Sequence, residues 1–146
     1  MYDSLDVADF IVKYSNEKGF SINNIKLQKI LYFIQAGFLV RYDHPCFRDD
    51  IEAWNFGPVV PIVYYAYLPY GGENISYYGN QSNKITKIAN EHKALIGQVV
   101  NACQRYSSME LIDITCHQKP YIEVYNSYST TAIKLDTLKK YFSSGE

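Results

Sequence analysis

With 146 residues, 47% of them hydrophobic, the chain is long enough for one compact domain, residues 1–146, around a single core. Its 14 Lys and Arg residues against 15 Asp and Glu residues leave a net charge of −1, so no positive field attracts nucleic acid or anionic lipid non-specifically. Three widely spaced cysteines exclude a disulfide framework and a zinc ribbon and favour a reducing cytoplasm, and the acidic N-terminus is unlike a secretory signal.

A first helix is expected from Ser4 to Ser15, because Val7, Ile11 and Tyr14 share one helical face. Gly19 follows at the right distance to end this helix. Acidic residues recur in its N-terminal half, where their negative charges interact favourably with the positive end of the helix dipole: Asp3, Asp6 and Asp9.

The second helix is expected to begin after the capping residues of "FSINN" and to continue to about Tyr42, before "DHP". Apolar residues recur along it with helical spacing, and most of its remaining circumference is apolar too: Leu27, Ile30, Leu31, Ile34 and Phe38. We therefore expect this helix to be the central, buried one. Its most apolar run, Ile30 to Val40, is shorter than the ~20 residues that cross a bilayer, which predicts no membrane partner.

One narrow seam of the central helix stays polar, because Gln28, Tyr32 and Gln35 follow one another at i, i+4 and i+7, flanked by Lys26 and Lys29. Two interpretations are open. The seam either forms buried hydrogen bonds that hold neighbouring elements or faces a partner, and its apolar surroundings favour the first.

The stretch "IEAWN" alternates as a short strand, with Ile51 and Ala53 on one side and Glu52 and Trp54 on the other. The following "GPVVP" predicts a corner, because glycine allows unusual backbone angles and proline restricts the residue before it. Pro61 suits the first turn of a short helix, expected over Ile62 to Tyr67.

The C-terminal half predicts further helices. A loop is expected from Glu73 to Asn83, followed by a long helix whose stripe runs from Ile85 to Cys103. Ser107 and Glu110 match a capping box that opens a helix from Ser108 to about Thr115. The remaining expected elements are a turn of helix at Pro120, an extended piece at Ala132 to Lys134, and a terminal helix capped by Asp136. The fold class is therefore mainly α, with a small β element.

No motif for catalysis, metal binding or phosphate binding is evident. The three histidines have no metal-ligand spacing, and the carboxylates of "DHPCFRDDIE" lack the alternation of a calcium loop. Cys116 and His117 are adjacent, so on a helix their side chains point ~100° apart. We therefore expect no catalytic residue, no metal and no cofactor, and a nucleic acid partner is disfavoured because no basic recognition helix is present.

Tyrosine is the compositional outlier, with 15 tyrosines in a chain that is 16% aromatic. Tyrosine is enriched at protein interfaces because it joins a large apolar ring to a polar tip, although it also replaces phenylalanine in small cores. The candidate partner contacts are Tyr64, Tyr65, Tyr67, Tyr70, Tyr77 and Tyr78.

Five blocks of the sequence, in order and over nearly the whole chain, resemble the Panacea domain, the family of SocA-like antitoxins and phage-associated GepA-type proteins. They are "LDVADFIV", "NNIKLQKILYFIQAGFLVRYDHPCF", "IEAWNFGPVVPIVYYAYLPYG", "LIDITCHQKPY" and "IKLDTLKKYF". The positions that match the family motifs are Lys26, Leu27, Gln28, Tyr32, Gln35, Glu52, Trp54, Gly57, Pro58, Val59, Pro61, Pro120 and Tyr121.

The resemblance implies a cytoplasmic, prophage or mobile-element antitoxin that is not an enzyme and neutralises a cognate toxin by direct protein binding. It further implies a chaperone-like action or an adaptor role that delivers the toxin to an ATP-dependent protease. The chain departs from the family where the pattern has His four residues before Pro and Trp after it. Here those positions are Cys116 and Tyr121, with His117 displaced by one.

Two alternatives come from other classes of protein. One is an uncharacterised hydrolase that uses Cys116 or His117 with Glu52 or Asp113, which requires these side chains to converge at one pocket. The other is a mobile-element regulator that binds its own operator, which requires a basic face.

Overall fold

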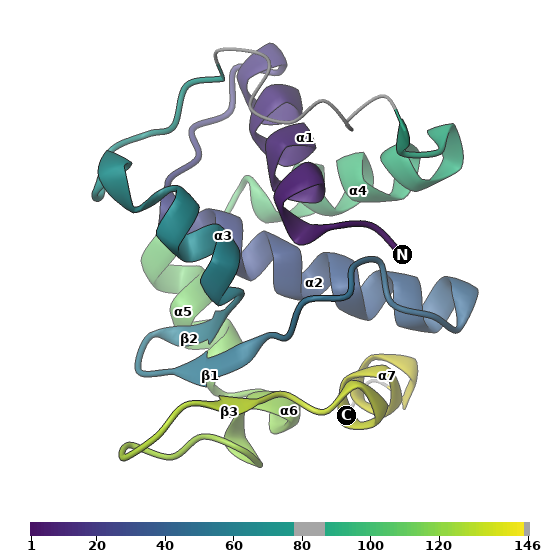
Figure 1. The fold of residues 1–146 in the computed structure, drawn as a ribbon, viewed down its shortest axis with the longest axis vertical. Coiled ribbons are helices and arrows are strands. Elements are labelled where there is room, and N and C mark those ends of the chain that lie inside the picture. The colour runs from purple at the N-terminus through teal and green to yellow at the C-terminus, as the bar shows by residue number, and fades with distance from the viewer. Residues whose placement is uncertain (78–86, 145–146) are drawn as a thin grey trace.

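The computed structural model describes residues 1–77 and 87–144, and within them helices pack around α2 with a small sheet at one side (Figure 1). The helices are α1 (Ser4–Glu17), α2 (Asn24–Tyr42), α3 (Pro61–Ala66), the 3-10 turn η1 (Leu68–Tyr70), α4 (Asn90–Cys103), α5 (Ser108–Cys116), α6 (Lys119–Ile122) and α7 (Leu135–Ser144). The strands are β1 (Glu52–Trp54), β2 (Gly57–Val59) and β3 (Thr131–Ala132), in the antiparallel order β2-β1-β3. The predicted fold class, mainly α with a small β element, is confirmed.

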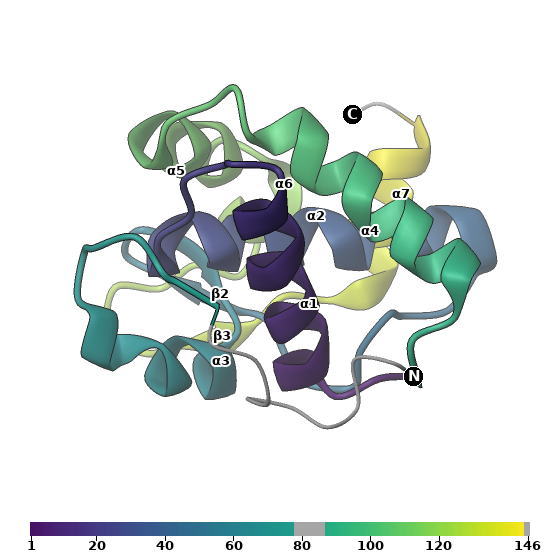
Figure 2. The same cartoon turned by 90° about the horizontal axis from the view of Figure 1, so that it is seen from above.

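Helix α2 is the centre of the fold, as its apolar circumference predicted. It runs across the middle of the molecule, with α1 and α4 on one side and the sheet, α6 and α7 on the other (Figure 1). Seen from above, α1 and α4 both lie over it (Figure 2). Leu27, Leu31 and Ile34 are completely buried, because α2 contacts other elements all round.

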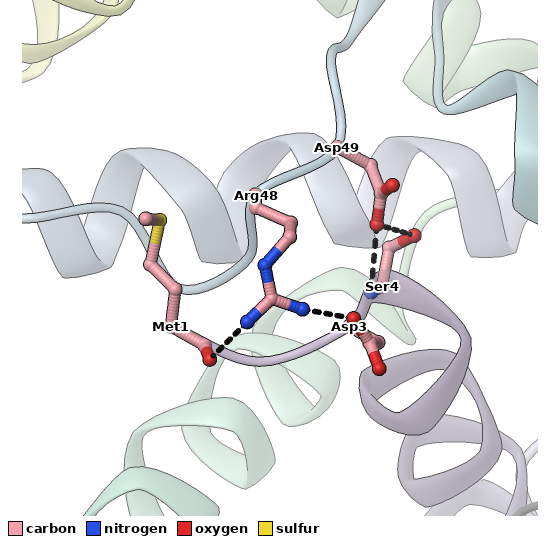
Figure 3. Close-up of polar contacts among 5 residues, drawn as sticks. All are labelled: Met1, Asp3, Ser4, Arg48 and Asp49. Atoms are coloured by element: carbon pink, nitrogen blue, oxygen red, sulfur yellow. Dashed lines mark hydrogen bonds and ion pairs between the residues drawn. The ribbon is translucent and has the colours of Figure 1, made fainter.

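The first turn of α1 is capped by a residue from another part of the chain. The N-cap residue Asp3 makes no side-chain capping bond. Instead, the Asp49 carboxylate accepts hydrogen bonds from the Ser4 backbone N–H at 3.0 Å and from the Ser4 Oγ at 2.6 Å (Figure 3). Arg48 donates to Asp3 and to the Met1 carbonyl, so two side chains of the 48–49 segment hold the N-terminus (Figure 3).

The first three residues of "GPVVP" form a strand, where the sequence predicted only a corner, which corrects the prediction. The chain turns earlier, at Asn55 and Phe56, and β2 pairs with β1 so that Trp54 lies opposite Gly57 and Ala53 opposite Pro58. A proline is tolerated there because β2 is an edge strand of the described sheet. Pro61 then begins α3, as predicted.

Later boundaries differ from the expectations by a few residues. The capping box of Ser107 and Glu110 is present in both directions at the start of α5. Helix α4 begins only at Asn90, and Ile85, the expected start of its stripe, lies outside the described residues. Asp136 lies inside the first turn of α7 and does not cap it, since the helix already begins at Leu135. Strand β3 ends at Ala132, before most of the extended piece that was expected.

Within residues 1–77 and 87–144, no helix combines the length and the apolar character that a bilayer crossing requires.

Candidate functional site

The polar seam of α2 is buried, and its glutamines hold neighbouring backbone. The Gln28 Nε2 donates to Asn24 Oδ1 at 2.9 Å, and its Oε1 accepts the Val60 N–H at 2.9 Å. Gln28 is completely buried, so the two bonds satisfy an amide that would otherwise be costly inside the core. The seam thus fixes the chain between β2 and α3, as the first of the two interpretations predicted.

Gln35 plays the same part at the other end of the seam. Its Oε1 accepts the N–H groups of Cys46 and Phe47 at 2.7 and 3.3 Å, and its Nε2 donates to the Phe47 carbonyl at 3.0 Å. One side-chain amide therefore holds the backbone that leads from α2 to the Asp49 cap of α1.

Tyr32, between the two glutamines, connects α2 to the segment before α6. Its hydroxyl donates to Gln118 Oε1 at 2.7 Å, and burial raises the pKa of this phenol. Leu27 is buried beside the seam, whereas Lys26 is only half-buried and donates to the Gln104 carbonyl at 3.1 Å. Partial burial lowers the pKa of Lys26.

Lys29 is a functional candidate that sequence reasoning treated only as a flank of the seam. Its side chain is completely buried, and its Nζ donates to the Pro58 carbonyl at 3.0 Å and lies 5.2 Å from the centre of the Phe56 ring. Burial lowers the pKa of Lys29 to about 7, against a smaller opposing effect of Cys116. The only sequence signal was its place beside Gln28 on an otherwise apolar helix.

Gly57 is the counterpart of Lys29 on the hairpin. Its φ of +105° disfavours any side chain, and an added Cβ would lie 3.0 Å from Lys29 Cε and 3.0 Å from Thr115 Oγ1. The β1–β2 hairpin therefore approaches α2 and α5 closely at this position, and Pro58, also buried, supplies the carbonyl that Lys29 binds. This close contact depends on glycine for both backbone and steric reasons.

Tyr121 also holds the hairpin. Its hydroxyl donates to the Trp54 carbonyl at 2.5 Å, and its ring is buried together with Pro120 at the start of α6. Burial raises the pKa of this phenol. Tyrosine at the position where the family pattern has tryptophan thus donates a hydrogen bond to the hairpin.

The outer face of the hairpin gathers aromatic rings. Trp54 packs against Phe56, Tyr64 and Tyr65, with ring centres 5.1 to 6.0 Å apart. The Trp54 indole N–H donates to Glu52 Oε1 at 2.9 Å, which holds the ring on the half-buried surface. We call these four aromatic residues the hairpin surface.

Of the six candidate tyrosines, the structure exposes one and half-buries three. Tyr65 is 60% exposed, and Tyr64, Tyr70 and Tyr77 are half-buried. Tyr78 lies outside the described residues.

Tyr67 is a correction, because it is a core residue and not a surface contact. Its hydroxyl donates to Asp9 Oδ1 at 2.5 Å, and burial raises the pKa of both groups. Tyr128, which the sequence reasoning passed over, is 96% exposed. It lines a hollow of about 390 Å³ beside the hairpin surface, and only tertiary structure brings its loop there.

Of the residues of the hydrolase alternative, His117 and Asp113 lie together, but both are exposed at the end of one helix. The His117 Nδ1 lies 2.7 Å from the Asp113 carbonyl and 3.5 Å from its Oδ1, and the two side chains are 76% and 78% exposed. Glu52 is engaged by Trp54, and Cys116 is close to Lys29 and Tyr121. Among the described residues, no group of three His, Cys, Asp or Glu side chains is arranged to hold a metal ion.

Comparison with known proteins identifies relatives of this chain. The family model described as "Antitoxin SocA-like, Panacea domain" matches residues 27–122, the span that contains all but the first three residues of α2, the hairpin and α6. Antitoxin SocA of Caulobacter vibrioides (strain NA1000 / CB15N) is 37% identical over 73 residues, which are 50% of this chain and 39% of that protein. The chain therefore aligns with well under two thirds of this relative's length. No solved structure matches the chain.

Proposed function

This chain belongs to the SocA-like antitoxin family of the Panacea domain, and from that premise we propose that it neutralises a cognate toxin by direct protein–protein binding. The observation that carries the proposal is how the family-motif residues are used. Gln28, Tyr32 and Gln35 use their polar groups for hydrogen bonds inside the protein, so the motifs build a rigid support and not a catalytic pocket.

The proposed contact is the hairpin surface together with Tyr128. Trp54 and Phe56 of the hairpin are held by ring contacts with each other and with Tyr64 and Tyr65 of α3. The hairpin itself is fixed by hydrogen bonds from Lys29 and Tyr121. Rigid, half-exposed aromatic rings bind with little loss of conformational entropy, which is why Tyr and Trp dominate interface hot spots. The hollow of about 390 Å³ beside them offers room for one or two side chains of a partner.

The proposal places the protein in the cytoplasm of a bacterium, with a toxin encoded beside it on a prophage or other mobile element. Its three unpaired cysteines agree with a reducing compartment. Chaperone-like holding of the toxin and its delivery to an ATP-dependent protease are further steps, and each requires that the toxin first be bound.

Co-expression with the product of the adjacent gene tests the proposal. We expect that product to arrest growth alone, to be harmless with this protein, and to co-purify with it. Tyr65→Ala should weaken co-purification at least tenfold, as expected for an interface hot spot. The control is Met109→Ala, which removes a 74% exposed side chain from the first turn of α5, outside the hairpin surface and the hollow beside it. A neighbouring product that is harmless alone, or that does not bind, contradicts the antitoxin function.

A further inference from the structure

A second surface lies along α2, separate from the hairpin surface. It is a groove of about 600 Å³ between α2, α4, α5 and α7. Phe33 and Gly37 of α2 line its floor, and Val99, Ala102, Ile114 and Phe142 line its sides. A groove of this volume with apolar walls can bury apolar side chains of a ligand, as the grooves that recognise amphipathic helices in other folds do.

The groove has a defined direction and length. Arg41, in the last turn of α2, lines one end. Arg105 lines the other end, because it follows Gln104, whose carbonyl accepts a hydrogen bond from Lys26 in the first turn of α2. The residues of α2 that line the groove run from Phe33 to Arg41 and those of α4 from Leu95 to Cys103, each about 12 Å along the helix axis at about 1.5 Å per residue. An α-helix of about two to three turns has the same length.

The positive charge of the groove favours an acidic occupant. Arg41 and Arg105 are the charged side chains among the described residues that line it, and both are cationic. Each guanidinium also lies over a neighbouring ring, Arg41 over Tyr42 and Arg105 over Tyr106, at 5.9 and 5.2 Å from the ring centres. An occupant therefore gains from carboxylates placed near the two ends of its apolar stripe.

We infer that this groove binds an amphipathic α-helix of a partner protein, with an apolar stripe toward Phe33 and Val99 and acidic residues toward Arg41 and Arg105. The inference rests on the proposed function only in taking the toxin as the natural source of the helix. Complementary charge and apolar burial would bring affinity and orientation together.

A labelled peptide tests the groove without the toxin. The probe is a helix-forming peptide of about 18 residues with a central leucine stripe of about two to three turns and Glu at both ends of that stripe, and its twin carries Lys in place of Glu. Fluorescence anisotropy should show the Glu peptide binding about tenfold tighter than the Lys peptide at low salt, with a smaller ratio at high salt. Equal binding of the two peptides, or no binding of the Glu peptide, overturns the inference.

A matched pair of variants on α4 locates the binding. Ala102 lines the groove and Ala94 does not, and both are exposed. Ala102→Trp should weaken the Glu peptide at least tenfold by filling the groove, while Ala94→Trp should leave it unchanged. If Ala102→Trp fails to fold, Ala102→Glu serves, and it should reverse the preference between the peptides. Equal effects at both positions contradict the inference.

The remaining outcomes separate this inference from the antitoxin function. Light scattering could show a dimer that Ala102→Trp dissociates. That result would assign the groove to a second copy of this chain and overturn the inference that a partner's helix binds there. Binding of the Glu peptide, with no binding of the adjacent gene product, supports the groove and contradicts the proposed function. If Ala102→Trp still binds that product and Tyr65→Ala does not, the antitoxin function is supported and the groove is not the toxin site.

Discussion

Replacing Lys29 by methionine should change how the stability of this protein depends on pH. Methionine keeps most of the length and apolar volume of the lysine stem but has no ammonium group. Lys29 is completely buried, with its Nζ bonded to the Pro58 carbonyl, so the charged form loses its hydration there. This burial lowers the Lys29 pKa from 10.5 to about 7.

The direction of the effect follows from proton counting. Between the folded pKa of about 7 and the ordinary value of 10.5, the unfolded chain binds the Lys29 proton and the folded chain does not. The free energy of unfolding therefore rises with pH in this window for the wild type, and this contribution is missing in Lys29→Met. Above the folded pKa, the slope of the free energy of unfolding against pH approaches about 1.4 kcal/mol per pH unit.

Lys29 of the folded chain is half-protonated at about pH 7. The free energy of unfolding of the wild type minus that of Lys29→Met should therefore increase by about 1.6 kcal/mol between about pH 7 and about pH 8.5. The variant also leaves the Pro58 carbonyl without its donor, a loss of about 1–3 kcal/mol that is the same at every pH in the window. Buried thiols and phenols whose pKa values are raised, such as Cys46 and Tyr32, occur in both proteins, so their titration cancels in the difference.

Urea denaturation at several pH values measures this difference. Trp54, the only tryptophan, reports on the hairpin that Lys29 contacts, and far-UV circular dichroism reports on the helices. Lys26→Met is the matched control, since Lys26 is only half-buried on the same helix and its pH-dependent effect should be smaller. Parallel stability curves for wild type and Lys29→Met over this window would refute the reasoning.

Three more changes test the contacts that shape the site. Gly57→Ala should lower the free energy of unfolding by about 2–4 kcal/mol, because its φ is +105° and its Cβ would lie 3.0 Å from two side chains. Gly19→Ala, with φ +75° and nothing within 4 Å of the Cβ, should cost only about 1 kcal/mol in the same urea titration. Asp49→Ala should lower stability by about 1 kcal/mol through loss of the α1 cap, measured by thermal denaturation. Arg48→Ala should change stability by less than about 0.5 kcal/mol, because the Arg48 ion pair is exposed, and a larger loss there than at Asp49 contradicts the capping role. Gln35→Met should cost about 3 kcal/mol by leaving three buried backbone groups unbonded, and hydrogen exchange should accelerate first in the segment after α2.

Much of the helical framework was predictable from local patterns. The apolar spacing of α2 placed it at the centre of the fold, and the Ser107–Glu110 pair marked the start of α5, where the structure has a full capping box. These features depend on residues within a few positions of one another, so their physical causes are contained in short stretches of sequence.

Strand β2 was missed because the corner residues Gly57 and Pro58 read as breakers of regular structure. In the fold they lie on an edge strand, where a missing N–H is harmless and where Gly57 meets Lys29. Tyr67 was placed on the surface for a similar reason, since nothing near it in sequence indicates its hydrogen bond with Asp9.

The sequence by itself determined the family motifs, the central helix and the absence of a recognisable catalytic pattern. Only the tertiary structure decided which polar groups are buried, which tyrosines face outward and where an apolar groove remains. The physical reason is that helical periodicity says which residues share a face but not what lies opposite. Burial lowers the Lys29 pKa to about 7, and Gly57 and Pro58, about 30 residues away in the chain, are part of what covers it.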